Sequence, residues 1–268
     1  MKGLSLFLGL GLALVATPLF AQAVPLEHFQ CYSVLNATPN VNVPLGLRDQ
    51  FNQAGTAPEQ VNALRAMRFC NPAGKFHRNQ FFPIADDRQH LMLYATFPQA
   101  GPVRAVALSN QFDRAGQNQV WWLGEPVAIL VPTQKPPHPK PEGLDHFRCY
   151  AASGPAVLET VGLIDQFLPF GGRAVLNPKL FCNPVEKTRL DTGEVTPILH
   201  PDLHLACYST TRVPFQTSRD IINQFGTQVV NLGPPDTLCV PTRKLAWVPI
   251  PDAPIGTPTA EGLDISFE

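Results

Sequence analysis

Four copies of one short module fill most of the chain, and this internal repeat constrains the fold more than any other feature. Each copy opens on His-[Phe/Leu]-x-[Cys/Leu]-Tyr, continues to Gln-Phe preceded by Asp or Asn, and closes on Pro-x-x-Lys. The opening motif occupies residues 28–32, 90–94, 146–150 and 204–208. The middle motif occupies residues 49–51, 110–112, 165–167 and 223–225, and the closing lysines are Lys75, Lys135, Lys187 and Lys244. A module of this size has a poor core alone, so the modules are expected to pack together.

The copies alternate in type, and the alternation groups them into two odd-even pairs. Odd copies contain Asp-Gln-Phe and Cys-Asn-Pro, whereas even copies contain Asn-Gln-Phe and Val-Pro-Thr. Copies two and four also align without a gap over the 17 residues that begin at Gln119 and Gln228, with nine identities. The pattern predicts a first repeat domain at 24–135, a Pro-rich linker at 136–141, a second repeat domain at 142–245 and a Pro-rich acidic tail at 246–268.

The alternation of side-chain character predicts β-strands. In the opening motif the apolar or cysteine positions lie two residues apart, as for Phe29 and Cys31, with His and Tyr on the other face. A competing helical spacing occurs only from Ala57 to Met67. Charged residues make up 15% of the chain, against about 25% in an average domain, and the 29 prolines favour many turns. We therefore predict an all-β fold of four short-stranded modules, in which each odd-even pair forms a small sandwich or barrel.

The combined motifs resemble an uncharacterised family of secreted bacterial tandem-repeat proteins. The resemblance rests on the order HFxCY, DQF and CNPxxK, followed by HLxCY, NQFG and LCVPxxK, and it covers nearly all of residues 26–244. It implies an exported bacterial protein with a domain of unknown function, and it brings no catalytic residues. Copy two departs from the pattern because it lacks both cysteines.

The missing cysteines of copy two predict how the other six pair. Alignment places Leu93 opposite Cys207 and Leu130 opposite Cys239. Loss of both partners leaves a buried slot that two leucines can fill, whereas loss of one would leave a free thiol. The predicted disulfides are Cys31–Cys70, Cys149–Cys182 and Cys207–Cys239. A zinc site built on His28 and nearby cysteines is the alternative, but it lacks a fourth ligand, so no metal or cofactor is expected.

The N-terminus has the three parts of a secretory signal peptide. Lys2 precedes an apolar run from Leu4 to Phe20, and Ala21-Gln22-Ala23 provides the small residues of a cleavage site. The segment 1–23 is therefore predicted to be removed, which leaves a secreted or periplasmic chain without an integral membrane segment. A formal net charge of −1 and the lack of a basic cluster argue against nucleic acid as a partner.

The residues that recur in all four modules have structural interpretations. The histidines of the opening motif are expected to form hydrogen bonds at strand starts, and the tyrosines to form packed rings. Asn cannot act as a general base, so the Asp and Asn of the middle motif are expected to accept backbone N–H bonds at a turn. The closing lysines are expected to be solvated strand ends, and Leu190 to Glu194 (LDTGE) is expected to be a turn.

One tryptophan breaks the repeat and is the candidate binding residue. Trp121 and Trp122 align with Val230 and Asn231. Trp121 shares the parity of Leu123 and is expected to point inward. Trp122 is then expected on the exposed face, where a tryptophan is typical of glycan or protein contacts. Packing of Trp122 against the other repeat domain is the alternative.

The sequence shows no familiar catalytic motif, and two classes of function follow. The first is an exported, disulfide-stabilised, non-catalytic repeat protein that binds an unknown protein or glycan of the cell surface, envelope or matrix. The second is a secreted hydrolase with an unrecognised active site, built from titratable residues that are unique to one module. The residues of that kind are His77, Asp86, Asp87, Asp191 and His200. We expect the binding protein, because the recurring polar residues have structural interpretations.

Overall fold

The predicted all-β class is confirmed by the structure, a computed structural model that describes residues 26–36, 38, 40–52, 55–97, 101–114 and 117–250. These residues form fifteen strands and no helix. The strands are β1 (Phe29–Val34), β2 (Val43–Arg48), β3 (Glu59–His77), β4 (Gln80–Phe82), β5 (Leu91–Thr96), β6 (Val103–Ser109), β7 (Gln119–Pro132), β8 (Phe147–Ser153), β9 (Glu159–Asp165), β10 (Gly171–Pro184), β11 (Glu186–Arg189), β12 (Val195–Thr196), β13 (His204–Thr210), β14 (Thr217–Asn223) and β15 (Gly226–Ile250). The predicted signal segment 1–23 and the part of the predicted tail beyond residue 250 lie outside the described residues.

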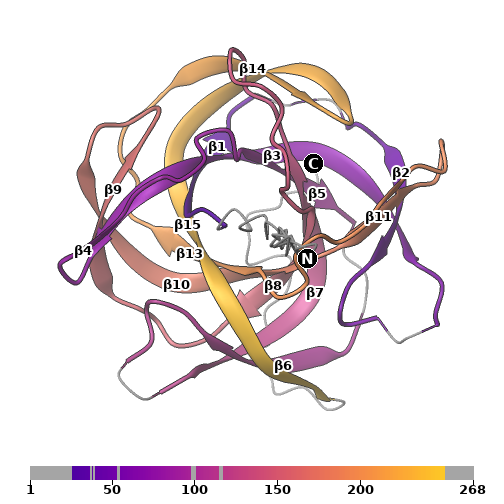
Figure 1. The fold of residues 1–268 in the computed structure, drawn as a ribbon, viewed down its shortest axis with the longest axis horizontal. Coiled ribbons are helices and arrows are strands. Elements are labelled where there is room, and N and C mark those ends of the chain that lie inside the picture. Colours follow the sequence, from indigo (N-terminus) through magenta and orange to yellow (C-terminus); the bar gives the residue numbers. More distant parts are fainter. Residues whose placement is uncertain are drawn as a thin grey trace, which may run out of the picture.

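Eight of these strands close into a ring, to which each module contributes two (Figure 1). The order around the ring is β1, β15, β13, β10, β8, β7, β5 and β3, and β3 pairs with β1 to close it. The pairings in the ring are antiparallel. The opening motif lies at the first strand of each module and the closing motif near the end of the second, so the sequence repeat becomes a fourfold repeat around the barrel.

Strands from both predicted repeat domains share this ring, so the two pairs do not form the separate sandwiches or barrels that the sequence predicted. β1 of the first pair lies beside β15 of the second, and β7 lies beside β8. The Pro-rich linker at 136–141 therefore joins two neighbouring strands of one sheet. The physical reason is that each module offers a strand edge on both sides, and a closed circle of four modules leaves no edge of the ring unpaired.

A short strand from each module lies outside the ring and covers it. β2, β6, β9 and β14 each pair with the outer part of the long strand that follows. All four also pair with chain from the module two places away: β2 with β11, β6 with the end of β15, β9 with the end of β3, and β14 through a bridge between Ile222 and Gln134. The start of the predicted tail, from Ala246 to Ile250, is thus strand that pairs with β6 of the first repeat pair.

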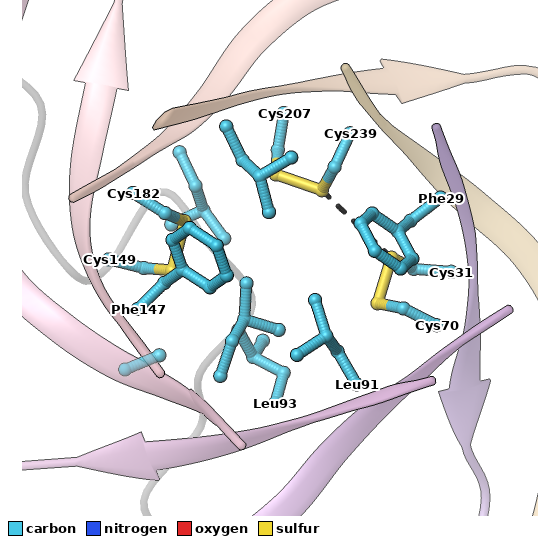
Figure 2. Close-up of a cluster of buried hydrophobic side chains, with 14 of the residues drawn as sticks. Phe29, Cys31, Cys70, Leu91, Leu93, Phe147, Cys149, Cys182, Cys207 and Cys239 are labelled. Atoms are coloured by element: carbon cyan, nitrogen blue, oxygen red, sulfur yellow. Dashed lines mark hydrogen bonds between the residues drawn. A yellow bond between two sulfur atoms is a disulfide. The ribbon is translucent and has the colours of Figure 1, made fainter. Parts of the chain in front are cut away.

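The interior of the ring is apolar and is lined by matching cross-strand pairs (Figure 2). The three predicted disulfides are present, Cys31–Cys70, Cys149–Cys182 and Cys207–Cys239. In module two Leu93 pairs directly with Leu130, at the position that the disulfides occupy in the other modules. Leu93 is 5% exposed and Leu130 is 1% exposed, so two leucines fill the fourth slot.

Outside the ring, the middle motif of each module contacts the tyrosine of the module two places away. The four hydrogen bonds, 2.8 to 2.9 Å long, are Asp49–Tyr150, Asp165–Tyr32, Asn110–Tyr208 and Asn223–Tyr94. The aspartates accept from the tyrosine hydroxyl, whereas the asparagine amides donate to it. Odd modules therefore contact odd modules and even modules contact even ones, which explains why the residue types alternate along the sequence.

The same side chains hold the turns that the sequence predicted for them. Each Oδ1 atom accepts the backbone N–H of the phenylalanine two residues later, at 2.8 to 2.9 Å, in the pairs Asp49–Phe51, Asn110–Phe112, Asp165–Phe167 and Asn223–Phe225. Each turn also places its phenylalanine edge-on against the same tyrosine that the Asp or Asn of that turn contacts. One turn thus supplies both the polar and the aromatic half of each contact between modules.

The glutamine of the middle motif contacts the histidine of the adjacent module. The four pairs, 2.8 to 3.2 Å long, are His28–Gln111, His90–Gln166, His146–Gln224 and His204–Gln50. The predicted structural role of the histidines is confirmed. Because burial disfavours the imidazolium ion, the pKa of His90 is lowered to about 4 and that of His146 to about 3.

The closing lysines, in contrast, are not the solvated strand ends that the sequence predicted. Lys75 and Lys187 are fully buried, Lys135 is 4% exposed, and Lys244 is half-buried. The ammonium group of Lys135 lies 4.6 Å from the ring centre of Phe167, which belongs to the next module. Desolvation lowers the pKa of Lys135 to about 8. The ring that covers Lys135 belongs to another module, so the local sequence around this lysine does not indicate that it is buried.

Candidate binding surface around Trp122

The five residues considered for a hydrolase site are each paired with a different side chain instead of with one another. The pairs are His77–Glu159 at 2.5 Å, Asp86–Arg88 at 2.8 Å, Asp87–His138 at 3.8 Å, Asp191–Arg189 at 2.6 Å and His200–Asp145 at 3.2 Å. Asp191 lies in the turn between β11 and β12, as predicted for LDTGE. The structure therefore does not bring the five residues into one catalytic group.

The two neighbouring tryptophans of β7 point to opposite faces of an outer sheet. Trp121 is fully buried and lies edge-on against Tyr208, with ring centres 5.1 Å apart. A Cβ atom at Gly154 would lie 2.6 Å from the indole of Trp121, so only glycine leaves room for this ring. Since side chains alternate along a strand, Trp122 lies on the outward face, where it is half-buried. The inward position predicted for Trp121 is confirmed.

Trp122 lies within an apolar face that crosses three antiparallel strands. Val248 of β15 pairs with Ala105 of β6, which pairs in turn with Trp122 of β7. A second row runs parallel to the first, with direct pairing of Ala246 to Ala107 and of Ala107 to Val120. We call this face the Trp122 platform and define it by Ala105, Ala107, Val120, Trp122, Ala246 and Val248.

The platform is partly open to solvent: Val120, Ala246 and Val248 are exposed, whereas Ala105, Ala107 and Trp122 are half-buried. Val248 is 54% exposed and Val120 is 48% exposed, although both are large apolar residues. The next outward pair along the strands, Ser109 with the exposed Arg243, is polar and forms one margin of the face. An exposed apolar centre with a polar margin is the arrangement of many protein contact surfaces.

The other three modules do not repeat this arrangement. The outward cross-strand pair that corresponds to Ala105–Trp122 is Pro44–Asn62 in module one, Thr160–Ala174 in module three and Ser218–Asn231 in module four. In module four the hydroxyl of Ser218 donates to the Asn231 side chain at 2.6 Å. The fold thus accepts a small or polar pair at this position, and the tryptophan of module two is not needed to close the barrel.

Sequence reasoning identified Trp122 but missed the strand beside it. Ala246 and Val248 belong to the predicted tail, more than 120 residues after Trp122 in the chain. Their position depends on the pairing of β15 with β6. In the predicted tail, the spacing of Ala246, Val248 and Ile250 two residues apart was the only local sign of a β-strand.

The described residues contain neither a metal-binding cluster nor a membrane-spanning helix. No group of three or more His, Cys, Asp or Glu side chains there is placed to hold a metal ion. Nor does that part of the chain contain a helix long and apolar enough to cross a membrane.

Comparison with known proteins identifies one family. A family model described as a repeat of unknown function (DUF7450) matches residues 95–241, which is more than half of the chain. The match runs from β5 to β15 and includes the platform strands β6 and β7. The search of curated proteins and the search of solved structures gave no match.

Proposed function

The chain belongs to the DUF7450 family, whose repeats have no assigned function, and we propose from its own surface that it is an exported, non-catalytic repeat protein that binds a partner. The partner in this proposal is a protein or glycan of the cell surface, envelope or matrix. The contact surface is the Trp122 platform. The observation that carries the proposal is a large aromatic residue on an outward face where the other three modules have small or polar residues.

The chemistry of the platform supports binding rather than turnover. Tryptophan is enriched among the residues that dominate binding energy, because its large flat side chain loses little conformational freedom when buried. Three small residues, Ala105, Ala107 and Ala246, lie on the same face as the half-buried Trp122. A flat apolar surface of this kind fits the face of a sugar ring or an apolar protein side chain.

The scaffold beneath the platform supports the same proposal. β6 pairs on one side with β7 and on the other with β15, so its backbone is held along both edges. Its inward side chains, Val106 and Leu108, are both fully buried. A surface that is rigid before binding loses little entropy on association.

Export is supported by the three disulfides, because such bonds persist in oxidising compartments. The signal segment leads to a direct measurement on the mature protein. Mass spectrometry of the exported chain should give Val24 as its first residue. A mature chain that retains the segment containing Lys2 would contradict export through a cleaved signal peptide.

The binding proposal is tested by Trp122→Asn, which introduces the residue that module four has at the same position. Immobilised wild-type and variant protein are incubated with the surface and matrix fraction of the producing cells, and the captured partner is quantified by mass spectrometry and glycan analysis. The matched control is Val229→Asn, since Val229 is 60% exposed on the outer face of module four. Loss of an anchor residue should weaken capture by ~2 kcal/mol, about 30-fold.

Thermal unfolding separates binding from packing. If the proposal is right, Trp122→Asn loses capture with a nearly unchanged Tm, and Val229→Asn retains capture. If Trp122→Asn lowers the Tm and leaves capture intact, the residue packs and does not bind. Hydrolysis of a glycan, peptide or ester that is abolished by changing Asp191 or His200 would favour the enzyme instead.

A further inference from the structure

A pocket of about 160 Å³ lies where modules one, two and three meet, beneath the start of β6. It is separate from the Trp122 platform, since alternate residues of β6 face the two sites. Its lining includes Phe51, Glu59, Arg104, Arg148 and Tyr150. Two arginines and two aromatic rings converge on this pocket.

Arg148 is a buried cation at the base of the pocket. It is 2% exposed, and its guanidinium lies 5.5 Å from the ring centre of Tyr150. Its Nη2 atom lies 2.6 Å from a carboxylate oxygen of Glu59, which is itself partly exposed. The corresponding residues of the other opening motifs are Gln30, Met92 and Ala206. The repeat therefore does not require arginine at this position.

Arg104 is the second cation and covers the same two rings. Its guanidinium carbon lies 4.8 Å from the ring centre of Phe51 and 5.6 Å from that of Tyr150. Nη1 donates to the carbonyl of Pro102 at 3.0 Å, while Nε is buried and has no hydrogen-bond partner within the described structure. The corresponding residues, six positions before Asp or Asn of the middle motif, are Val43, Glu159 and Thr217.

The net charge of the pocket favours a ligand that carries one negative charge. Three cations surround the two rings: Arg104, Arg148 and Lys244, whose ammonium lies 4.6 Å from the ring centre of Phe51. The carboxylates of Glu59 and Asp49 provide two negative charges, which leaves one positive charge uncompensated. The oxygens of Asp49 already accept from Tyr150, Asn183 and the backbone of Phe51, so they do not serve as the acceptor for Nε of Arg104. A monoanion would balance the pocket and give the buried Nε of Arg104 an acceptor.

We propose that this pocket binds the carboxylate group of a small organic ligand. A carboxylate is a planar monoanion that matches the planar fork of a guanidinium. The rings of Phe51 and Tyr150 provide an apolar wall for a short aliphatic or aromatic group attached to it. The pocket volume limits the ligand to a small molecule or the end of a chain.

The proposal is tested with benzoate and acetate as probes, by calorimetric titration of the intact protein. Benzamide, which has the shape of benzoate without its charge, and inorganic sulfate are the comparison ligands. Arg104→Gln removes one cation and leaves the Arg148–Glu59 pair in place. Arg148→Gln introduces the residue of module one. The matched control is Arg219→Gln, because Arg219 is exposed and lies over Phe167, the counterpart of Phe51, at 5.1 Å.

Benzoate is expected to bind the wild-type protein and Arg219→Gln equally, and at least tenfold more weakly to Arg104→Gln and Arg148→Gln. Benzamide and sulfate are expected to bind at least tenfold more weakly than benzoate. Arg104→Gln keeps the result interpretable if Arg148→Gln fails to fold. Benzoate binding that is absent, that is unchanged in Arg104→Gln, or that is matched by sulfate overturns the proposal. Trp122→Asn should leave benzoate binding unchanged, which separates this site from the platform.

Discussion

Replacement of Cys207 and Cys239 together by leucine tests whether the four modules contain one interchangeable slot. The two cysteines are 32 residues apart, so loss of their disulfide costs ~4 kcal/mol in the chain-entropy model. Either single replacement loses the same bridge and also leaves a lone thiol against a leucine. The two single costs therefore sum to ~8 kcal/mol or more. The double replacement should cost only ~4 kcal/mol, because Leu93 and Leu130 already pair in this way in module two.

The control is the double replacement of the same cysteines by alanine, which loses the bridge and leaves a cavity. A buried leucine shortened to alanine typically costs 2–5 kcal/mol, so about 2 kcal/mol or more should separate the two double variants. Equilibrium unfolding in urea, monitored by circular dichroism and tryptophan fluorescence, measures the difference. Equal stability of the leucine and alanine variants would refute the shared slot, as would additive costs of the single replacements.

Two further predictions concern the closed ring and the buried histidines. The halves 24–141 and 142–268, expressed separately, should each lack protected amides in hydrogen exchange, because ring closure requires strands of both; a half that folds alone would restore the two-domain interpretation. Because folding lowers the pKa of His90 from 6.5 to about 4, the unfolded chain binds the proton first. The contribution of His90 to the free energy of unfolding is then fully present above pH 6.5. It is lost as the pH falls towards 4, which lowers the stability by up to ~3 kcal/mol. Urea midpoints that stay constant from pH 7 to pH 4.5 would contradict this.

Much of the local structure was predictable from the sequence because the repeat serves as an internal alignment. The absence of both cysteines at Leu93 and Leu130 is informative, because a disulfide needs two partners. Asn110 and Asn223 stand where the odd modules have aspartate, so this position has no role that requires a carboxylate in every module. Such comparisons identify what a position tolerates. They led to the disulfides and the Asx turns, which form within one module, and to the inward position of Trp121, which follows from the alternation along its own strand.

What the sequence did not predict depends on contacts between modules. Lys135 looks like a solvated strand end until Phe167 of the next module covers it. The alternation of Asp and Asn suggested paired modules along the chain, whereas it reflects contacts between modules two places apart, such as that of Asp49 with Tyr150. Periodicity in a sequence identifies equivalent faces, but it does not specify which equivalent face is the neighbour.

The most direct test of the binding account is site-specific photo-crosslinking in the producing cells. A benzophenone amino acid is placed at Ala107, in the Trp122 platform, or at Asp220, which holds the corresponding outward position of module four and pairs with Val229. The account predicts one recurrent crosslinked partner from Ala107, weak or absent crosslinking from Asp220, and loss of the Ala107 product when Trp122→Asn is added. Equal products from both positions, or an Ala107 product that persists in the Trp122→Asn background, would contradict it.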